Sequence, residues 1–93
     1  MDRPDAAFTP IERARLAEKG RLLYRKSCGA SGKKTCAEGF ARHHINRGEI
    51  DVARDLLAFL ETEAEALRAD DPAGRLTFTE ALAARIRTDL DAN

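Results

Sequence analysis

Apolar residues recur at helical spacing along most of the chain, and the clearest stretch spans about 51–69. Its apolar members fall at i, i+3, i+4, i+7, i+11 and i+14: Ala53, Leu56, Leu57, Leu60, Ala64 and Leu67. This spacing places the six side chains on one face of an α-helix and predicts that this face is buried. Val52 and Phe59 widen the stripe at one edge, and the turn-forming residues 70–74 end the helix.

A second amphipathic stretch spans about 10–27 and carries its own start signal. Thr9 can cap the helix, Pro10 suits its first turn, and Glu12 can reach back to the Thr9 amide. The predicted buried face consists of Leu16, Ala17, Gly20, Leu23 and Tyr24. Because glycine costs about 1 kcal/mol relative to alanine inside a helix, Gly20 indicates the close approach of another helix. Residues 1–8 are charged and contain a proline, and we expect them to form a flexible arm.

A third helix is expected at about 36–47. Thr35 and Glu38 repeat the capping pattern at its start, and Gly48 is suited to cap its end. One face carries Ala37, Phe40, Ala41, His44 and Ile45. We expect His44 to pack at the edge of the core with one nitrogen hydrogen-bonded, and His43 to border solvent.

The last helix is expected at about 78–91, with Thr77 and Glu80 as its capping pair. Its apolar side carries Phe78, Leu82, Ala83, Ile86 and Leu90. Short connections between such helices predict an all-α fold, a compact bundle of about four amphipathic helices. We expect residues 9–93 to form a single domain.

The composition predicts a thin core. Only five of the 93 residues are aromatic, so the core must be built mainly from Leu, Ala and Ile. A domain of this size often gains stability by forming a dimer or by docking on a partner.

The charges are sorted along the chain, although they sum to zero. Residues 11–47 contain ten Lys or Arg and three Glu, a net charge of +7, whereas residues 48–93 contain eleven Asp or Glu and five Arg, a net charge of −6. Such asymmetry indicates either that the two halves face each other or that one of them meets a charged partner.

The stretch 35–68 resembles a single tetratricopeptide repeat. The small and large apolar positions of that helix-turn-helix family fall here at Ala37, Phe40, Ala41, His44, Ala53, Leu57 and Leu60, with Gly48 and Glu49 at the turn. The proline that the family places after the second helix is Glu65 here. The resemblance implies a helical hairpin of this geometry and, by analogy, protein binding.

We expect a protein-interaction or regulatory module, an adaptor or accessory subunit that binds a larger and acidic partner. Its surface would be an apolar groove of the helical hairpin, flanked by the basic face of the first helix. The residues expected to contact the partner are Arg21, Arg25, Lys26, His43 and Arg47, with Phe59 as an exposed apolar anchor. A second copy of the chain is another possible partner.

Nucleic-acid binding by the basic half is an alternative. Arg15 and Lys19 lie on the outer side of the first helix, and Lys33 and Lys34 continue the positive charge into the following loop. The two lysines would also lie at a helix N-terminus, which favours anions.

A thiol or metal switch is a further alternative. Cys28 and Cys36 could form a disulfide, and together with His43 and His44 they are the candidate ligands of a zinc ion. Their spacing departs from the usual zinc pattern, so we expect no cofactor.

The sequence shows no recognisable Ser/His/Asp set and no pair of carboxylates in an apolar pocket. We therefore expect no enzymatic activity. No apolar run is long enough to span a membrane, and the N-terminus lacks the apolar stretch of a secretory signal. We therefore expect a cytoplasmic protein that does not bind membranes.

Overall fold

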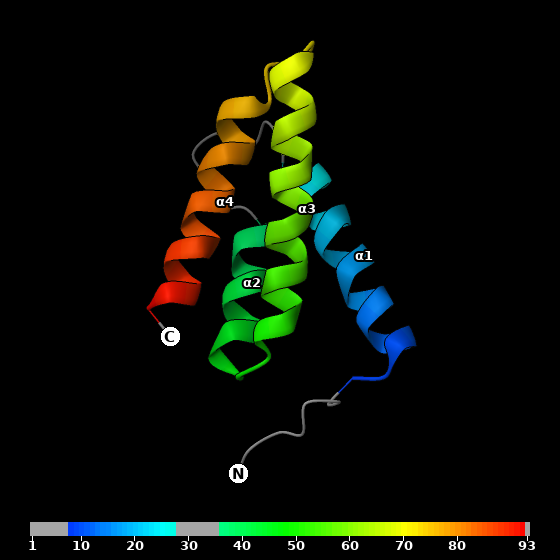
Figure 1. The fold of residues 1–93 in the computed structure, drawn as a ribbon. Helices are drawn as coiled ribbons and strands as arrows, with labels where there is room; N and C mark the ends of the chain where they lie inside the picture. Colours follow the sequence, from blue (N-terminus) through cyan, green and yellow to red (C-terminus); the bar gives the residue numbers. More distant parts are fainter. Residues whose placement is uncertain (1–7, 28–35, 93) are drawn as a thin grey trace.

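The computed structural model describes residues 8–27 and 36–92, which fold into a bundle of four helices (Figure 1). These are α1 (Pro10–Ser27), α2 (Cys36–Asn46), α3 (Ile50–Ala69) and α4 (Leu76–Asp91). Successive helices run in alternating directions, and α3 packs against each of the other three. The predicted all-α bundle is confirmed, and each helix begins and ends within two residues of its predicted bounds.

The start of α1 is held by a pair of reciprocal hydrogen bonds. The Glu12 amide donates to the Thr9 hydroxyl at 3.1 Å, and the Thr9 amide donates to the Glu12 carboxylate at 2.9 Å. These bonds satisfy amides that a helix N-terminus otherwise leaves without partners, so the predicted capping box is confirmed. Phe8, the last residue of the expected arm, is half-buried against the core. Residues 1–7 lie outside the described part of the chain.

The turn between α2 and α3 depends on Gly48, whose φ of +80° lies in the left-handed region. The Gly48 amide donates to the Ile45 carbonyl at 2.9 Å, and the Glu49 amide donates to the His44 carbonyl at 2.8 Å. This is the Schellman pattern that ends many helices. Gly48 therefore caps α2 as predicted, and the chain turns directly into α3.

The start of α4 differs from the prediction. The helix begins at Leu76, and its first-turn amides are not capped by Thr77 and Glu80. Instead, the Asp71 carboxylate accepts the amide of Arg75 at 2.7 Å and the amide of Leu76 at 3.0 Å. These hydrogen bonds stabilise the charged carboxylate and lower the pKa of Asp71. The predicted capping pair is wrong, because the capping carboxylate is that of Asp71, which precedes the Pro-Ala-Gly turn.

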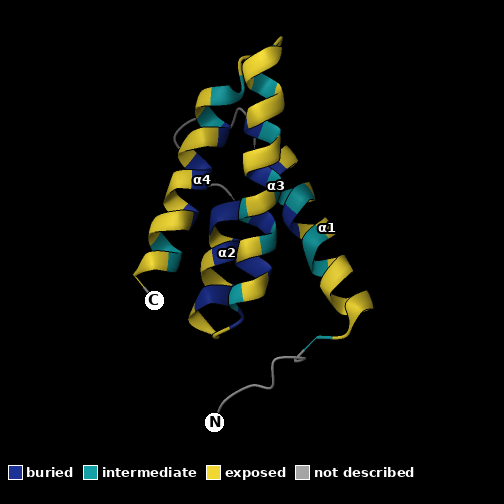
Figure 2. Ribbon diagram, in the orientation of Figure 1, coloured by how far each residue is buried: buried dark blue, intermediate teal, exposed yellow. Residues whose placement is uncertain are grey.

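Buried residues line the inner faces of the helices, and exposed residues cover the outside (Figure 2). The core consists of Tyr24, Ala37, Phe40, Ala41, Ile45, Val52, Ala53, Leu56, Leu60, Leu82, Ala83 and Ile86. A Cβ atom placed on Gly20 would come within 3.1 Å of the Phe40 ring and 3.4 Å of Leu56. The close helix approach predicted from Gly20 is therefore confirmed.

The buried residues of each helix occupy one side rather than the whole circumference (Figure 2). Within residues 8–27 and 36–92, none of the helices is both long enough and apolar enough to cross a lipid bilayer.

Candidate functional site

The apolar groove expected at the α2–α3 hairpin is filled by the rest of the molecule. Both α1 and α4 pack against α2 and α3, and Ala37, Ala41 and Ala53 are fully buried. α2 and α3 form a helical hairpin, and its apolar face is the core of the bundle. The prediction of an open groove is wrong, because α1 and α4 cover the surface that a repeat protein leaves to its neighbours.

The six residues predicted to contact a partner lie in two separate places. Arg21, Arg25 and Lys26 belong to the C-terminal part of α1, and Arg21 lies near Phe59 of α3. His43 and Arg47 lie at the end of α2, beside the turn to α3 and away from the first group (Figure 1). The structure therefore does not unite them in one surface.

Phe59 is not the exposed anchor that was predicted. It is half-buried, and its ring meets the ring of Tyr24 edge-on with 5.6 Å between centroids. The guanidinium of Arg21 lies over the Phe59 ring at 5.9 Å and also pairs with Glu18 on the same helix. The prediction fails because Phe59 faces the junction of α1, α3 and α4, where aromatic residues pack together.

The buried side chain of His44 bonds to the buried side chain of Glu49. Its Nδ1 atom lies 2.7 Å from Oε1 of Glu49, and Nε of Arg47 lies 3.4 Å from the same carboxylate. His43 is exposed, and its ring meets the His44 ring edge-on. The expectation that His44 packs with one nitrogen hydrogen-bonded is confirmed. In the Schellman turn these two positions usually make an apolar contact, which the polar pair replaces here.

Most residues of the proposed thiol or metal switch lie outside the described part of the chain. Cys28, Lys33, Lys34 and the side chain of Cys36 are not among them, so the disulfide, zinc and anion-site hypotheses stay predictions. Among the residues that are described, no group of three or more His, Cys, Asp or Glu could hold a metal ion.

Some cations of the basic half pair with carboxylates of the acidic half of the same molecule. Nε and Nη2 of Arg13 on α1 donate to the Asp55 carboxylate on α3 at 2.8 and 2.9 Å, and Asp51 lies 3.8 Å away. These contacts raise the pKa of the Arg13 guanidinium. Arg42 of α2 lies 3.3 Å from the carboxylate of Asp89 on α4. One of the two interpretations of the sorted charge, that the halves face each other, therefore holds for these pairs.

The outer face of α1 carries cations without such partners. Arg15, Lys19 and Lys26 are exposed, and none of them makes an ion pair within residues 8–27 and 36–92. Ile11 and Leu22 lie next to these cations on the same face; they are 67% and 45% exposed and are the exposed large hydrophobic residues of that part of the chain. Because each residue turns a helix by about 100°, the five side chains fall within about 80° of its circumference. We call these five residues the α1 stripe.

The sequence identified the cations of the α1 stripe and missed its apolar members. Ile11 and Leu22 lie outside the apolar face that was predicted for this helix, and they are eleven residues apart, about three full turns. That spacing places both on the side of the helix that carries Arg15, so it could have indicated their exposure from the sequence. Arg25 is also exposed, at the border of the stripe.

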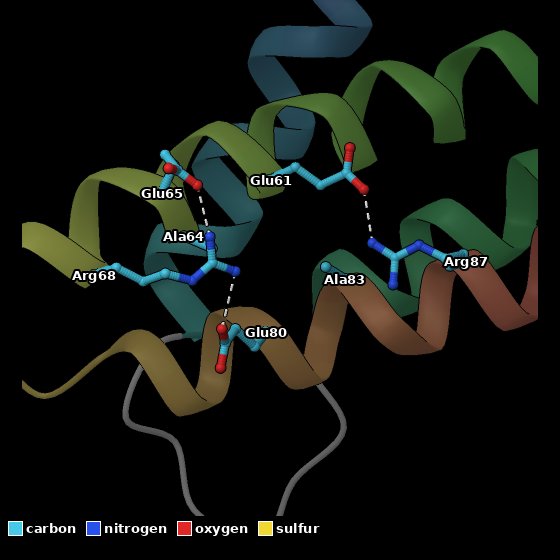
Figure 3. A pocket seen from close by; sticks show the side chains of 7 residues that line it. All are labelled: Glu61, Ala64, Glu65, Arg68, Glu80, Ala83 and Arg87. Carbon is cyan, nitrogen blue, oxygen red and sulfur yellow. Dashed lines mark hydrogen bonds and ion pairs between the residues drawn. The ribbon is translucent and has the colours of Figure 1, made fainter.

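A groove of about 370 Å³ between α3 and α4 is bordered by charged side chains (Figure 3). Arg87 donates across it to Glu61 at 2.7 Å, and Arg68 donates to Glu65 at 2.7 Å and to Glu80 at 3.1 Å. One alanine from each helix lies beneath these pairs. Because the guanidinium groups of Arg68 and Arg87 already have carboxylate partners, we infer that these ion pairs help to hold α3 and α4 together.

A shallow, open surface lies on the outer side of α3. Five exposed residues line it: Ala58, Glu61, Thr62, Glu65 and Ala66. Three of these side chains are small, and the other two are the glutamates that pair with Arg87 and Arg68 at the α3–α4 groove.

The chain matches no protein family model, and neither a curated protein nor a solved structure is significantly similar to it. The tetratricopeptide-like pattern therefore describes a local helical hairpin, and we assign no family.

Proposed function

We propose that this chain is a small, non-enzymatic interaction module, an adaptor or accessory subunit that binds an acidic protein through the α1 stripe. The main support is the exposure of Ile11 and Leu22 among cations that lack partners in the described structure. Several other arginines, such as Arg13 and Arg87, are held by carboxylates of the same molecule. A helix that presents both apolar and basic side chains to solvent is suited to an apolar surface edged by carboxylates.

The two kinds of side chain would contribute differently to binding. Full burial of a side chain such as Ile11 or Leu22 contributes about 1.5–3 kcal/mol. An exposed ion pair contributes about 0.2–1 kcal/mol and mainly steers the approach of the partner. The affinity would therefore rest on the apolar residues, and the cations would set orientation and association rate.

Replacing the two cations Arg15→Gln and Lys19→Gln together should weaken recovery of the partner. We expect a loss of roughly two- to thirtyfold in affinity, the equivalent of two exposed ion pairs. The measurement is quantitative affinity purification from extracts of the source cells. The matched control, Arg54→Gln with Arg85→Gln, removes the same charge from exposed positions on α3 and α4. Equal recovery of every protein by both variants would contradict the proposal.

Nucleic-acid binding through the same cations is the second candidate. It is supported by the alignment of Arg15, Lys19 and Lys26 along one face of α1. None of the five aromatic residues of the chain is exposed, so none is free to stack on bases, and this favours a protein partner.

Fluorescence polarisation with labelled single-stranded and duplex DNA and RNA separates the two candidates. Binding that weakens steeply with added salt and is lost in the Arg15→Gln, Lys19→Gln variant would support the nucleic-acid candidate. Absence of binding at low salt would exclude it.

A further inference from the structure

The five side chains of the α1 stripe form one row along the helix axis. In the sequence, Ile11, Arg15, Lys19, Leu22 and Lys26 follow one another in steps of four, four, three and four residues. Because an α-helix rises about 1.5 Å per residue, the stripe is about 22 Å long, and its two apolar members lie about 16 Å apart. A partner that covers both of them must therefore run along α1 for about three turns.

The helix that carries the stripe is open to a partner and fixed in place. Each of residues 10–15 is exposed, so the first turns of α1 are accessible. The capping box of Thr9 and Glu12 and the two hydrogen bonds from Arg13 to Asp55 hold this segment as a helix against α3. A surface that is already formed loses little conformational freedom when a partner binds.

The spacing of the stripe fits a second helix better than an extended strand. Side chains on one face of a helix recur at intervals of about 4.5–6 Å, so an aligned helix stays in step with the stripe over its whole length. On a strand, the side chains of one face recur at about 6.7 Å and fall out of step by about 4 Å over the four steps. A small crossing angle of about 20° keeps both ends of the stripe in contact with the partner helix.

The cations of the stripe determine the charge of the partner. Arg15 and Lys19 lie between the two apolar members. Glu18, a carboxylate beside them on α1, pairs with Arg21 of the same helix. A partner that covers the apolar members also reduces the access of water to these cations, which is unfavourable unless it supplies opposite charges. The partner helix must therefore carry carboxylates between its apolar side chains.

A lipid surface fits the stripe less well than a protein helix does. Helices that lie on membranes bury a broad apolar face between lipid head groups. On α1 the exposed large apolar residues are Ile11 and Leu22, which lie three turns apart with cations between them. This arrangement favours a partner whose charges stand at matching positions.

We propose that the acidic partner of the α1 stripe presents an amphipathic helix that lies along α1. The apolar side chains of that helix cover Ile11 and Leu22. Its carboxylates lie between them, against Arg15 and Lys19. The inference rests on the proposed function, because it takes the stripe as the docking surface and names the element of the partner that binds there.

Fluorescence polarisation with synthetic, hydrocarbon-stapled helical peptides tests the inference. The matched peptide carries leucine, glutamate, glutamate, leucine and glutamate on one face in the steps of the stripe, and it is made in both chain directions. The control peptide has the same composition, with its glutamates on the opposite face. We expect a matched peptide to bind roughly tenfold or more tightly than the control. Equal binding of matched and control peptides, or no binding of either matched peptide, would overturn the inference.

Single substitutions test whether the contact spans the whole stripe. Ile11→Gln and Leu22→Gln should each weaken binding of the matched peptide by roughly tenfold, because each removes one apolar contact. Ala84→Gln, at an exposed position of α4, is the control and should leave binding unchanged. A loss of affinity at one of the two apolar positions alone would overturn the aligned helix.

Two further outcomes separate this inference from the proposed function. Failure of the peptides, while Arg15→Gln with Lys19→Gln still reduces recovery of a protein from extracts, would overturn the helix and leave the proposed function standing. Co-sedimentation with vesicles of phosphatidylcholine and phosphatidylserine that is lost in Ile11→Gln and Leu22→Gln would assign the stripe to a lipid surface and overturn both.

Discussion

Tyr24 joins three helices through a side chain that is fully buried. Its hydroxyl lies 2.7 Å from Oγ1 of Thr79, which is also fully buried, and its ring is stacked with that of Phe78 at 6.0 Å. The edge of the ring meets Phe59 of α3. Because a buried hydroxyl without a partner costs about 1–3 kcal/mol, this pair fixes how α1 meets the start of α4.

Removing one hydroxyl of this pair should destabilise the fold. We expect Tyr24→Phe to lower the free energy of unfolding by about 1–3 kcal/mol, because it leaves the Thr79 hydroxyl buried without its partner. Adding Thr79→Val should cost less than the sum of the two single changes, since neither partner then stays unsatisfied. Urea unfolding of the four proteins measures this coupling, and additive effects would show that the hydrogen bond carries no stability of its own.

At the scale of helices, the cap of α4 makes stability depend on pH. Hydrogen bonds from the amides of Arg75 and Leu76 hold the pKa of Asp71 below its ordinary value of 3.8. On acidification the unfolded chain therefore takes up a proton at this carboxylate before the folded chain does. The stabilisation is fully present above 3.8 and is lost as the pH falls through the lower value of the folded state.

Asp71→Ala should therefore destabilise the protein at neutral pH by an amount that shrinks in acid. Urea unfolding along an acid series measures the difference between wild type and variant. Asp70→Ala, a change at the exposed neighbouring aspartate, is the control and should show a smaller effect that does not follow this pH dependence. A constant difference between wild type and Asp71→Ala at all pH values would contradict the assigned cap.

The helices could be predicted from the sequence because their signals are local. Thr9 and Glu12 stand three residues apart, and Gly48 follows α2 directly, so both were recognisable. The cap of α4 was missed because Asp71 lies five residues before Leu76, and only the folded turn brings them together. A cap of this kind depends on the path of the turn rather than on a spacing pattern.

The candidate site was harder to predict than the helices. The cations of α1 can be read from the sequence. Whether each of them has an ion-pair partner depends on which carboxylates the fold brings near, as it brings Asp55 to Arg13. The exposure of Leu22 follows from the side on which α1 packs, which the contact of Gly20 with Phe40 sets. The prediction of an open hairpin groove was wrong for the same reason, because a local apolar pattern does not indicate which other helices pack on that face.

At the scale of the whole molecule, the net charge is zero, but the charged side chains are distributed unevenly over the surface. Pairs such as Arg13 with Asp55 and Arg42 with Asp89 join parts of the chain that are more than 40 residues apart. The cations of the α1 stripe are left outside these pairs, whereas Glu61 and Glu65 on the outer side of α3 are each paired with an arginine. The bundle thus offers one basic and apolar surface, on the outer face of α1.

The central claim is that the outer face of α1 is a docking surface, and site-specific photo-cross-linking tests it most directly. A photoreactive amino acid would replace Lys19 in the stripe or, as the control, Arg85 on α4, and the full chain would be irradiated in the source cells. We predict discrete cross-linked products from position 19, containing either another protein or a second copy of the chain, and far less product from position 85. Equal yields from the two positions would contradict the account.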